Sequence, residues 1–217
     1  MAEKIDSIFF DMDGTLWNAV DSYTKAWNEY LVSEENGKPI SSDLLSSLMG
    51  EEEELVLSQI LPQMDKQVQT ILYNKHIIPL IYKVVETDGG HLYDGVLKGL
   101  SLLSKKYKLF IVSNCPERLI ECFIRYAGID DLITDSLAYG QNFRPKSENM
   151  VLLKEKYKLR HPVYAGDTDS DRIQCKMANI PFFYMDYGFG KCNQYAQKFS
   201  RFNDFVEFML LTSSEKN

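Results

Sequence analysis

The chain has 217 residues, of which 45% are hydrophobic and 25% are charged. This composition is typical of a globular protein with one substantial core, and it excludes a disordered chain. The formal net charge of −7 disfavours extended contact with nucleic acid or anionic lipid, because a negative surface repels phosphate groups. The longest apolar runs are far shorter than the roughly twenty residues that span a membrane. We therefore expect a small-molecule partner and contact with neither a membrane nor nucleic acid.

The four cysteines show neither CxxC spacing nor a dense disulfide framework, and no basic-then-apolar leader precedes residue 8. They are Cys115, Cys122, Cys175 and Cys192. We expect reduced thiols and a cytoplasmic location. The histidines are scattered, so structural zinc is not expected. We also expect a monomer or a weak homodimer.

Three apolar segments, residues 5–10, 107–112 and 162–165, are predicted to be buried strands, and each ends at polar residues. Helical patterns occupy 96–105, 117–127 and 147–157, with apolar residues three and four apart. Alternating strands and helices predict an α/β fold with a parallel sheet covered on both faces. Ligands bind such sheets beyond the carboxyl ends of the strands, where the polar residues collect.

Residues 17–90 break this alternation. Helical periodicity without strand signals covers 20–31, 42–48, 51–61 and 64–85. The sequence therefore predicts an all-helical insert at 17–90 and a core made of 1–16 and 91–217. The chain crosses between them near 16–18 and 88–90, and the paired glycines of the second crossing favour a hinge.

Asp11 and Asp13 follow the first strand in the run Asp-Met-Asp-Gly-Thr. An extended chain directs both side chains the same way, and Gly14 permits a tight turn behind them. Phosphoryl transfer needs an oxygen nucleophile, a proton donor for the leaving alcohol and cations near the phosphoryl oxygens. Asp11 can attack, and Asp13 can donate and then accept a proton. The pair alone does not establish catalysis, because aspartates also form turns and cap helices.

A second carboxylate cluster, with Asp167, Asp169 and Asp171, follows the third predicted strand and precedes a helix. Oxygen ligands suit a hard cation such as Mg²⁺. A calcium-binding EF-hand loop would require a glycine and a distal glutamate at fixed positions, and both are missing. The cluster therefore favours magnesium.

Three further residues fall between or at the strand ends. Lys146 could neutralise a phosphoryl oxygen or the nucleophile, whereas Ser113 and Asn114 offer a hydroxyl, an amide and backbone N–H groups to phosphoryl oxygens. In isolation each has an ordinary interpretation, as a surface lysine or a turn.

In this order the four segments resemble the motifs of the haloacid dehalogenase superfamily: residues 11–15, Ser113, Lys146 and 166–171. Residues 178–181 and 187–190 also resemble the closing segment of phosphoglycolate-phosphatase-like members. The resemblance implies a Rossmann-like three-layer core with a helical cap, and a Mg²⁺-dependent phosphatase that acts on a small phosphorylated metabolite. Phosphoglycolate as the substrate rests on the resemblance alone.

The resemblance also implies roles for individual residues. Asp11 is the nucleophile and a metal ligand, Asp13 is the general acid and base and ligates the metal through its backbone carbonyl, and Asp167 is the third protein ligand. Asp171 is expected to support the site, and whether it contacts the metal directly or through water stays open. Asp169 has no counterpart in the motif and is expected to be a solvated residue at a helix start. Asn18 stands where many phosphatases carry an acidic residue, which leaves the substrate class open.

Three other classes of function fit these residues less well. Haloacid dehalogenases normally lack the second aspartate, so Asp13 argues against that activity. Sugar phosphomutases of the β-phosphoglucomutase type keep both aspartates, but they resemble this chain with a cap histidine where Tyr23 stands. A receiver-like signalling protein would have no helical insert after the first strand. Another non-enzymatic phosphate-binding protein would have little reason to keep Asp11, Asp13, Lys146 and Asp167 together.

Several conspicuous residues have ordinary interpretations. Trp17 and Trp27 are expected to pack rather than to bind substrate, and Cys115 is expected to be a buried small residue. The acidic run 51–54 is expected to begin a helix. If that run faces the active site, it would disfavour substrates that carry an extra negative charge.

Overall fold

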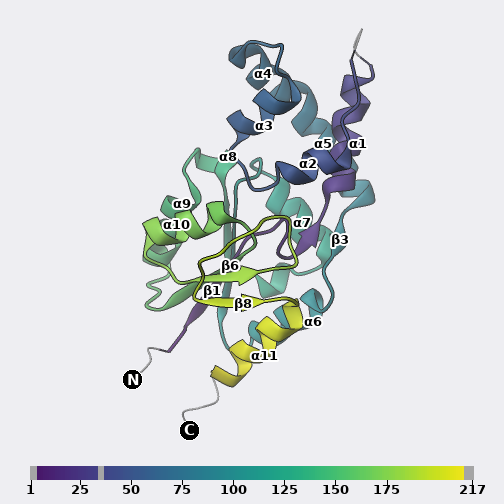
Figure 1. Ribbon diagram of the computed structural model, residues 1–217. Helices are drawn as coiled ribbons and strands as arrows, with labels where there is room; N and C mark the ends of the chain where they lie inside the picture. The colour runs from purple at the N-terminus through teal and green to yellow at the C-terminus, as the bar shows by residue number, and fades with distance from the viewer. Residues whose placement is uncertain (1–3, 34–36, 213–217) are drawn as a thin grey trace.

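The computed structural model describes residues 4–33 and 37–212, and its core is one parallel sheet of six strands in the order β5-β4-β1-β6-β7-β8 (Figure 1). The strands are β1 (Ser7–Phe10), β4 (Lys108–Ser113), β5 (Asp135–Ala138), β6 (Pro162–Gly166), β7 (Phe182–Met185) and β8 (Gln197–Phe199). Strand β1 pairs in parallel with β4 on one side and with β6 on the other, so the order in which the chain adds strands to the sheet reverses at β1. Such a switch point is where parallel sheets bind ligands.

Helices cover both faces of this sheet. They are α6 (Val96–Leu103), α7 (Leu119–Ala127), the short α8 (Tyr139–Asn142), α9 (Lys146–Lys156), α10 (Asp169–Ala178) and α11 (Phe202–Thr212), with a 3₁₀ turn at Asp130–Leu132. The α/β fold predicted from the sequence is confirmed.

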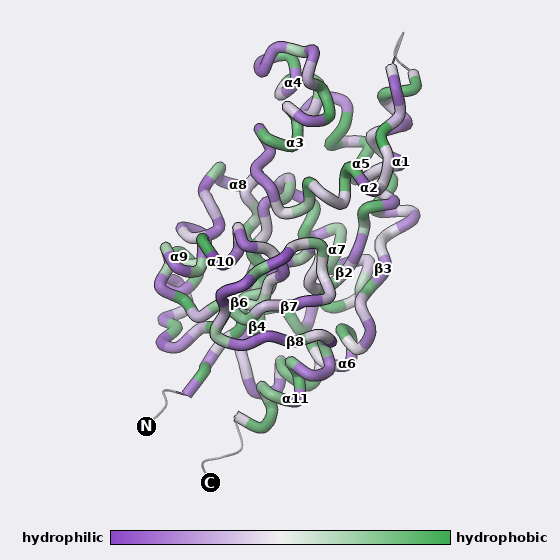
Figure 2. The backbone as a smooth tube through the Cα atoms, in the orientation of Figure 1, coloured by the Kyte–Doolittle hydropathy of each residue, from purple (hydrophilic) through white to green (hydrophobic). Residues whose placement is uncertain are grey.

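The alternation of side chains along the strands divides the core into two layers. In β1, Ile8 and Phe10 pack with α6, α7 and α11, whereas Phe9 packs with α9 and α10 on the opposite face. Because neighbouring strand residues point to opposite faces, a fully apolar strand buries both. Helices α6 and α11 are mostly hydrophobic and lie side by side on the face of the sheet to which Ile8 and Phe10 point (Figure 2). The sheet and the helices on its two faces form the three layers of the core.

The three predicted strands at 5–10, 107–112 and 162–165 correspond to β1, β4 and β6. The sequence analysis did not identify β5, β7, β8 or α11. Strands β5 and β8 lie at the two edges of the sheet and carry polar residues, so neither shows the continuous apolar run of a central strand. The hydrophobic run of β7 contains only four residues.

The helical insert lies on one side of the sheet, at the top of Figure 1. It contains α1 (Val20–Leu31), α2 (Ser42–Ser47), α3 (Glu53–Ile60), α4 (Lys66–Leu72), a π-helical turn (Tyr73–Ile77) and α5 (Ile78–Asp88). The predicted helix at 64–85 is therefore interrupted. Pro79 has no N–H to donate to the carbonyl of residue 75, which explains why the α-helical bonding changes there.

A two-stranded antiparallel ribbon joins the insert to the sheet region: β2 (Trp17–Asn18) pairs with β3 (His91–Leu92). The predicted insert at 17–90 thus begins with a strand, while its division from a core at 1–16 and 91–217 stays a prediction. Gly89 has φ 65° and ψ −146°, and a Cβ there would lie 2.0 Å from the Tyr126 ring. A glycine is required at this crossing by conformation and packing, whatever its role as a hinge.

All four cysteines are buried free thiols, as expected, and the cytoplasmic location inferred from them stays a prediction. Trp17 is fully buried and packs on Phe123 with ring centroids 4.7 Å apart, which confirms its packing role. Within residues 4–33 and 37–212, every helix is too short or too polar to cross a membrane.

We predict that Gly89→Ala lowers the free energy of unfolding by about 3 kcal/mol or more, because alanine disfavours this backbone conformation and its Cβ displaces the Tyr126 ring. Gly128→Ala is the matched control. Gly128 also has positive φ (64°) but has nothing within 4 Å of the added Cβ, so the expected loss is about 1 kcal/mol. Urea denaturation of both variants measures the difference, and equal losses would contradict the packing argument.

Candidate active site

The predicted site residues meet at the carboxyl ends of the central strands. Asp11 follows β1, Ser113 ends β4, Lys146 begins α9 and Asp167 follows β6. Each of the four is at most 5% exposed. The backbone N–H of Asp11 donates to Ala165 O at 2.9 Å, which fixes the end of β1 beside the end of β6. The fold therefore brings together residues that are up to 156 positions apart, from Asp11 to Asp167.

Lys146 holds two carboxylates of this site. Its Nζ lies 2.9 Å from Asp11 Oδ1 and 2.7 Å from Asp171 Oδ1, and the lysine side chain is 2% exposed. Burial lowers the pKa of Lys146, but the two carboxylates outweigh burial and raise that pKa above its usual value. The lysine therefore stays an ammonium ion inside the protein.

Asp171 is fully engaged by its neighbours. Besides Lys146, its Oδ1 accepts from the Tyr164 hydroxyl at 3.2 Å, while its Oδ2 accepts from Thr168 N at 3.1 Å and from Thr168 Oγ1 at 2.8 Å. In return, Thr168 Oγ1 accepts from Asp171 N at 3.1 Å, which completes a capping box at the start of α10. The spacing of Thr168 and Asp171 is a capping signal that the sequence analysis missed.

Asp167 lies in a confined space between two loops. Its Oδ2 accepts backbone N–H groups from Phe189 at 2.7 Å and from Gly190 at 3.3 Å. A Cβ on Gly14 would lie 2.3 Å from Asp167 Oδ2, and one on Gly188 would lie 2.4 Å from the same atom. Both glycines thus leave room for the carboxylate, and the 187–190 segment noted in the sequence orients it.

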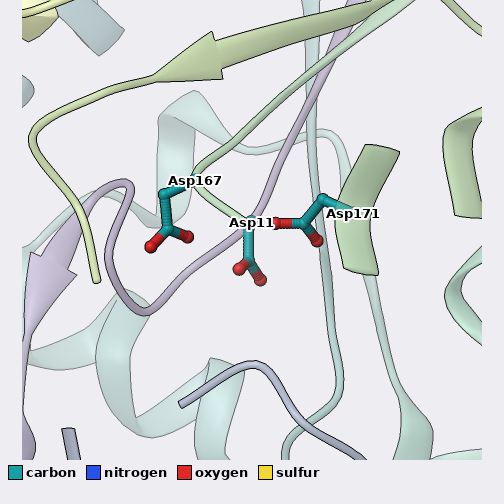
Figure 3. Close-up of side chains that lie close together, drawn as sticks. All are labelled: Asp11, Asp167 and Asp171. Atoms are coloured by element: carbon teal, nitrogen blue, oxygen red, sulfur yellow. The ribbon is translucent and has the colours of Figure 1, made fainter. Parts of the chain in front are cut away.

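The carboxylates of Asp11, Asp167 and Asp171 lie together in Figure 3, with one oxygen of each within 4.8 Å of the others. Asp167 Oδ1 is buried and accepts no hydrogen bond, whereas the partner of Asp11 Oδ1 is the Lys146 ammonium at 2.9 Å. Burial raises the pKa of Asp11 to about 6, and burial together with Asp171 and Asp11 raises the pKa of Asp167. A buried acceptor without a donor and a surplus of negative charge are what a bound cation would relieve. An all-oxygen set fits Mg²⁺.

Asp13 lies beside Asp11 and contacts the insert. The hydroxyl of Tyr23 in α1 donates to Asp13 Oδ1 at 3.0 Å and lies 3.2 Å from Oδ2, and both residues are buried. Burial and the charge of Asp11 raise the pKa of Asp13 to about 7, so its carboxyl can hold or release a proton near neutral pH. Sequence reasoning noted Tyr23 only as a replacement for histidine and missed this contact.

Ser113 and Asn114 line a cavity of about 100 Å³ together with Asp11, Asp13 and Lys146. Asn114 Nδ2 also donates to Gly50 O in the insert at 3.4 Å, so its amide bridges the two parts of the chain. Glu51 lines the same cavity, as the sequence analysis considered, and α3 begins two residues later at Glu53. The insert therefore forms part of this cavity.

Other residues singled out in the sequence lie outside the charged cluster. Asp169 is on the surface and pairs with Arg172, as expected of a helix-start residue. Asn18 Oδ1 accepts from Val20 N at 3.0 Å and so caps the beginning of α1. Cys115 lines the cavity, but burial and Asp13 raise the pKa of its thiol, which disfavours a thiolate nucleophile. Trp27 is 2% exposed and stacks on Tyr73, with ring centroids 5.8 Å apart.

Most of the chain is similar in sequence to known hydrolases. A family model described as haloacid dehalogenase-like hydrolase matches residues 8–185. A phosphoglycolate phosphatase of Colwellia psychrerythraea is 26% identical over 220 residues, covering 94% of this chain and 96% of the relative. A phosphoglycolate phosphatase of Rhodobacter capsulatus is 22% identical over 190 residues, covering 85% and 86%.

Solved structures share the fold. A haloacid dehalogenase-like hydrolase from Streptococcus pneumoniae superposes with a TM-score of 0.81 at 18% identity, covering 94% of this chain and 98% of that one. A protein from Haemophilus somnus, described as a predicted phosphoglycolate phosphatase, also gives a TM-score of 0.81, at 21% identity, covering 96% and 99%. At these identities the structures establish a common architecture.

We predict that Lys146→Met lowers the free energy of unfolding in EDTA by about 3–5 kcal/mol, because it leaves buried carboxylates without their cation. Mg²⁺ should restore part of this loss by binding the same carboxylates. Lys156→Met is the matched control, since the Lys156 side chain is 63% exposed in its ion pair with Asp135 and its removal should change little. Urea denaturation with and without Mg²⁺ measures both variants, and an equally small effect for Lys146→Met would refute the charge balance described above.

Proposed function

The chain belongs to the haloacid dehalogenase-like hydrolase family, and on this basis we propose that it is a Mg²⁺-dependent phosphatase of small phosphate monoesters. The observation that carries the proposal is the meeting of Asp11, Asp13, Ser113 and Lys146 at one cavity, with an unpartnered carboxylate oxygen of Asp167 close to Asp11. The relatives named phosphoglycolate phosphatases support a small phosphorylated substrate.

The residues that would hold Mg²⁺ are Asp11, the backbone carbonyl of Asp13, and Asp167. The free Oδ1 of Asp167 and the position of Asp11 in the carboxylate cluster support this assignment, while the hydrogen bonds that occupy Asp171 favour a supporting role for it. Bound Mg²⁺ would neutralise the carboxylates and the charge on the transferring phosphoryl group.

Asp11 is proposed as the nucleophile. Its carboxylate oxygen attacks phosphorus and forms an aspartyl-phosphate as the alcohol leaves. Lys146, held 2.9 Å from Asp11, can stabilise phosphoryl oxygens, and Ser113 and Asn114 can donate hydrogen bonds to them. Lys146 also keeps Asp11 ionised and therefore nucleophilic.

Asp13 is proposed to protonate the departing alcohol and then to deprotonate the water that hydrolyses the aspartyl-phosphate. Its position beside Asp11 and its raised pKa support this exchange of a proton. The hydrogen bond from Tyr23 restricts the orientation of the carboxyl group. Because Tyr23 belongs to α1, this bond also couples the acid and base to the position of the insert.

We further propose that residues 17–90 act as a cap that excludes bulk water during attack. Two contacts between the insert and the site support closure: Tyr23 to Asp13, and Asn114 to Gly50. A sugar phosphomutase remains the weaker alternative, because the position expected to carry a cap histidine holds Tyr23, whose hydroxyl is already bound to Asp13.

We predict that Asp11→Asn lowers kcat for acetyl phosphate and for p-nitrophenyl phosphate by about a thousandfold or more, because an amide is a poor nucleophile. EDTA should abolish the wild-type activity, and Mg²⁺ should restore it. Asp169→Asn removes a surface aspartate of the neighbouring cluster and should retain full activity. Phosphate release measures all three, and an Asp11→Asn enzyme within tenfold of wild type would overturn the assigned nucleophile.

We predict that Tyr23→Phe lowers kcat by about fivefold to tenfold with little change in KM, because it removes one hydrogen bond that orients Asp13. Tyr107→Phe is the control: the Tyr107 hydroxyl donates a buried hydrogen bond to Met209 O at 2.6 Å, remote from the site. Both variants should lose similar stability. Steady-state kinetics should separate them, and a comparable drop in kcat for both would show that Tyr23 acts only on stability.

A further inference from the structure

The cavity beside Asp11 is built from two unlike sets of residues. The strand ends and α9 contribute its ionic and hydrogen-bonding groups, including Asp11, Ser113 and Lys146. The insert contributes mainly hydrophobic side chains. They include Trp27, Leu45, Leu48, Met49, Tyr73 and Ile81. A phosphate ester seated with its phosphorus at Asp11 therefore directs its leaving group toward an apolar wall.

Aromatic rings form the most rigid part of this wall. Trp27 and Tyr73 stack at an interplanar angle of 20°, and the Trp27 ring is 2% exposed. Tyr73 begins the π-helical turn and Trp27 belongs to α1, so two segments of the insert meet at this part of the cavity wall. Such a wall stabilises carbon-rich groups through burial and dispersion.

The charges around the cavity disfavour a bound ester whose leaving group already carries a negative charge. Among the described lining residues, the charged ones are Asp11, Asp13, Glu51 and Lys146, three acids and one base. Lys146 is the one cation of that set, and it already lies against Asp11 and Asp171. A carboxylate on the leaving group would thus enter an apolar space without a cation to pair with it.

The absence of a cation for such a carboxylate should change the free energy of substrate binding by more than a small difference in substrate size would. A buried carboxylate that loses its hydration without gaining a partner is strongly disfavoured, whereas a methyl-bearing group of the same shape gains from burial. The cavity of about 100 Å³ accommodates a leaving group of a few heavy atoms.

We propose that the substrate is a phosphate monoester of a short, uncharged and largely apolar alcohol, and that esters with a carboxylate on the leaving group are poor substrates. This inference rests on the proposed phosphatase function and specifies its substrate class. It separates this chain from the activity named for its phosphoglycolate phosphatase relatives.

The first experiment compares two substrates of matched shape, isobutyl phosphate and phosphoglycolate, with wild-type protein and Mg²⁺. The branched methyl groups of the first replace the two carboxylate oxygens of the second. The expected result is a kcat/KM about a hundredfold higher for isobutyl phosphate. Acetyl phosphate, with Asp11→Asn as the negative control, reports separately on whether the chain is a phosphatase.

A substitution in the wall tests the cause of the preference. Met49→Lys places an ammonium among the apolar residues and should shift the ratio of the two kcat/KM values toward phosphoglycolate by about tenfold or more. Met64→Lys is the matched control, because Met64 is 40% exposed and outside the cavity, and it should leave the ratio unchanged. Turnover of acetyl phosphate by Met49→Lys verifies that the variant is folded.

The outcomes are distinct. A wild-type preference for phosphoglycolate, or no preference, overturns the substrate class while leaving the phosphatase function intact. Hydrolysis of acetyl phosphate with no turnover of isobutyl phosphate overturns it too. If no phosphate compound is hydrolysed, the proposed function itself fails and the inference falls with it. A strong preference for isobutyl phosphate that Met49→Lys narrows supports the apolar, uncharged class.

Discussion

The buried ion cluster around Lys146 is the constraint on which the rest of the molecule depends. One ammonium is enclosed with Asp11 and Asp171, and Asp167 lies within reach of both carboxylates. Enclosed charges of this kind are unfavourable unless each is paired, so the surrounding structure is organised to pair them. The capping box of α10 satisfies Asp171, the 187–190 segment satisfies one oxygen of Asp167, and Gly14 and Gly188 provide the room. The oxygen of Asp167 that is left without a donor lies where a divalent cation is proposed to bind.

Much of this arrangement follows from the sequence because it is local. A strand that is apolar throughout and ends abruptly at an aspartate specifies both a buried central position and the location of the carboxylate, as at Asp11 and Asp167. The edge strands β5 and β8 could not be predicted in the same way. Their residues are partly exposed, and their pairing is determined by tertiary contacts with β4 and β7.

The contact between Tyr23 and Asp13 shows where sequence reasoning ends. Helical periodicity predicts α1 but contains no information on how α1 sits against the strand ends, which depends on the packing of α1 with α5 and on the ribbon of β2 and β3. The same holds for Met49 and Tyr73, whose place in the cavity wall results from the fold of the insert. The groups proposed to be catalytic therefore lie in short motifs, whereas the groups proposed to select the substrate are dispersed through the insert.

Chemical trapping of the aspartyl-phosphate tests the assignment of Asp11 as the nucleophile. Acetyl phosphate releases acetate, which needs no proton, so the Asp13→Asn variant should still phosphorylate Asp11 but hydrolyse the product slowly. Acid quenching, borohydride reduction and peptide mass spectrometry would then identify the modified residue. If Asp11 is the nucleophile, homoserine is expected at position 11. It should form only when Mg²⁺ is present and should be absent from the Asp11→Asn, Asp13→Asn double variant. Consumption of acetyl phosphate by the Asp13→Asn variant with Asp11 unmodified, or with another residue reduced, would contradict this assignment.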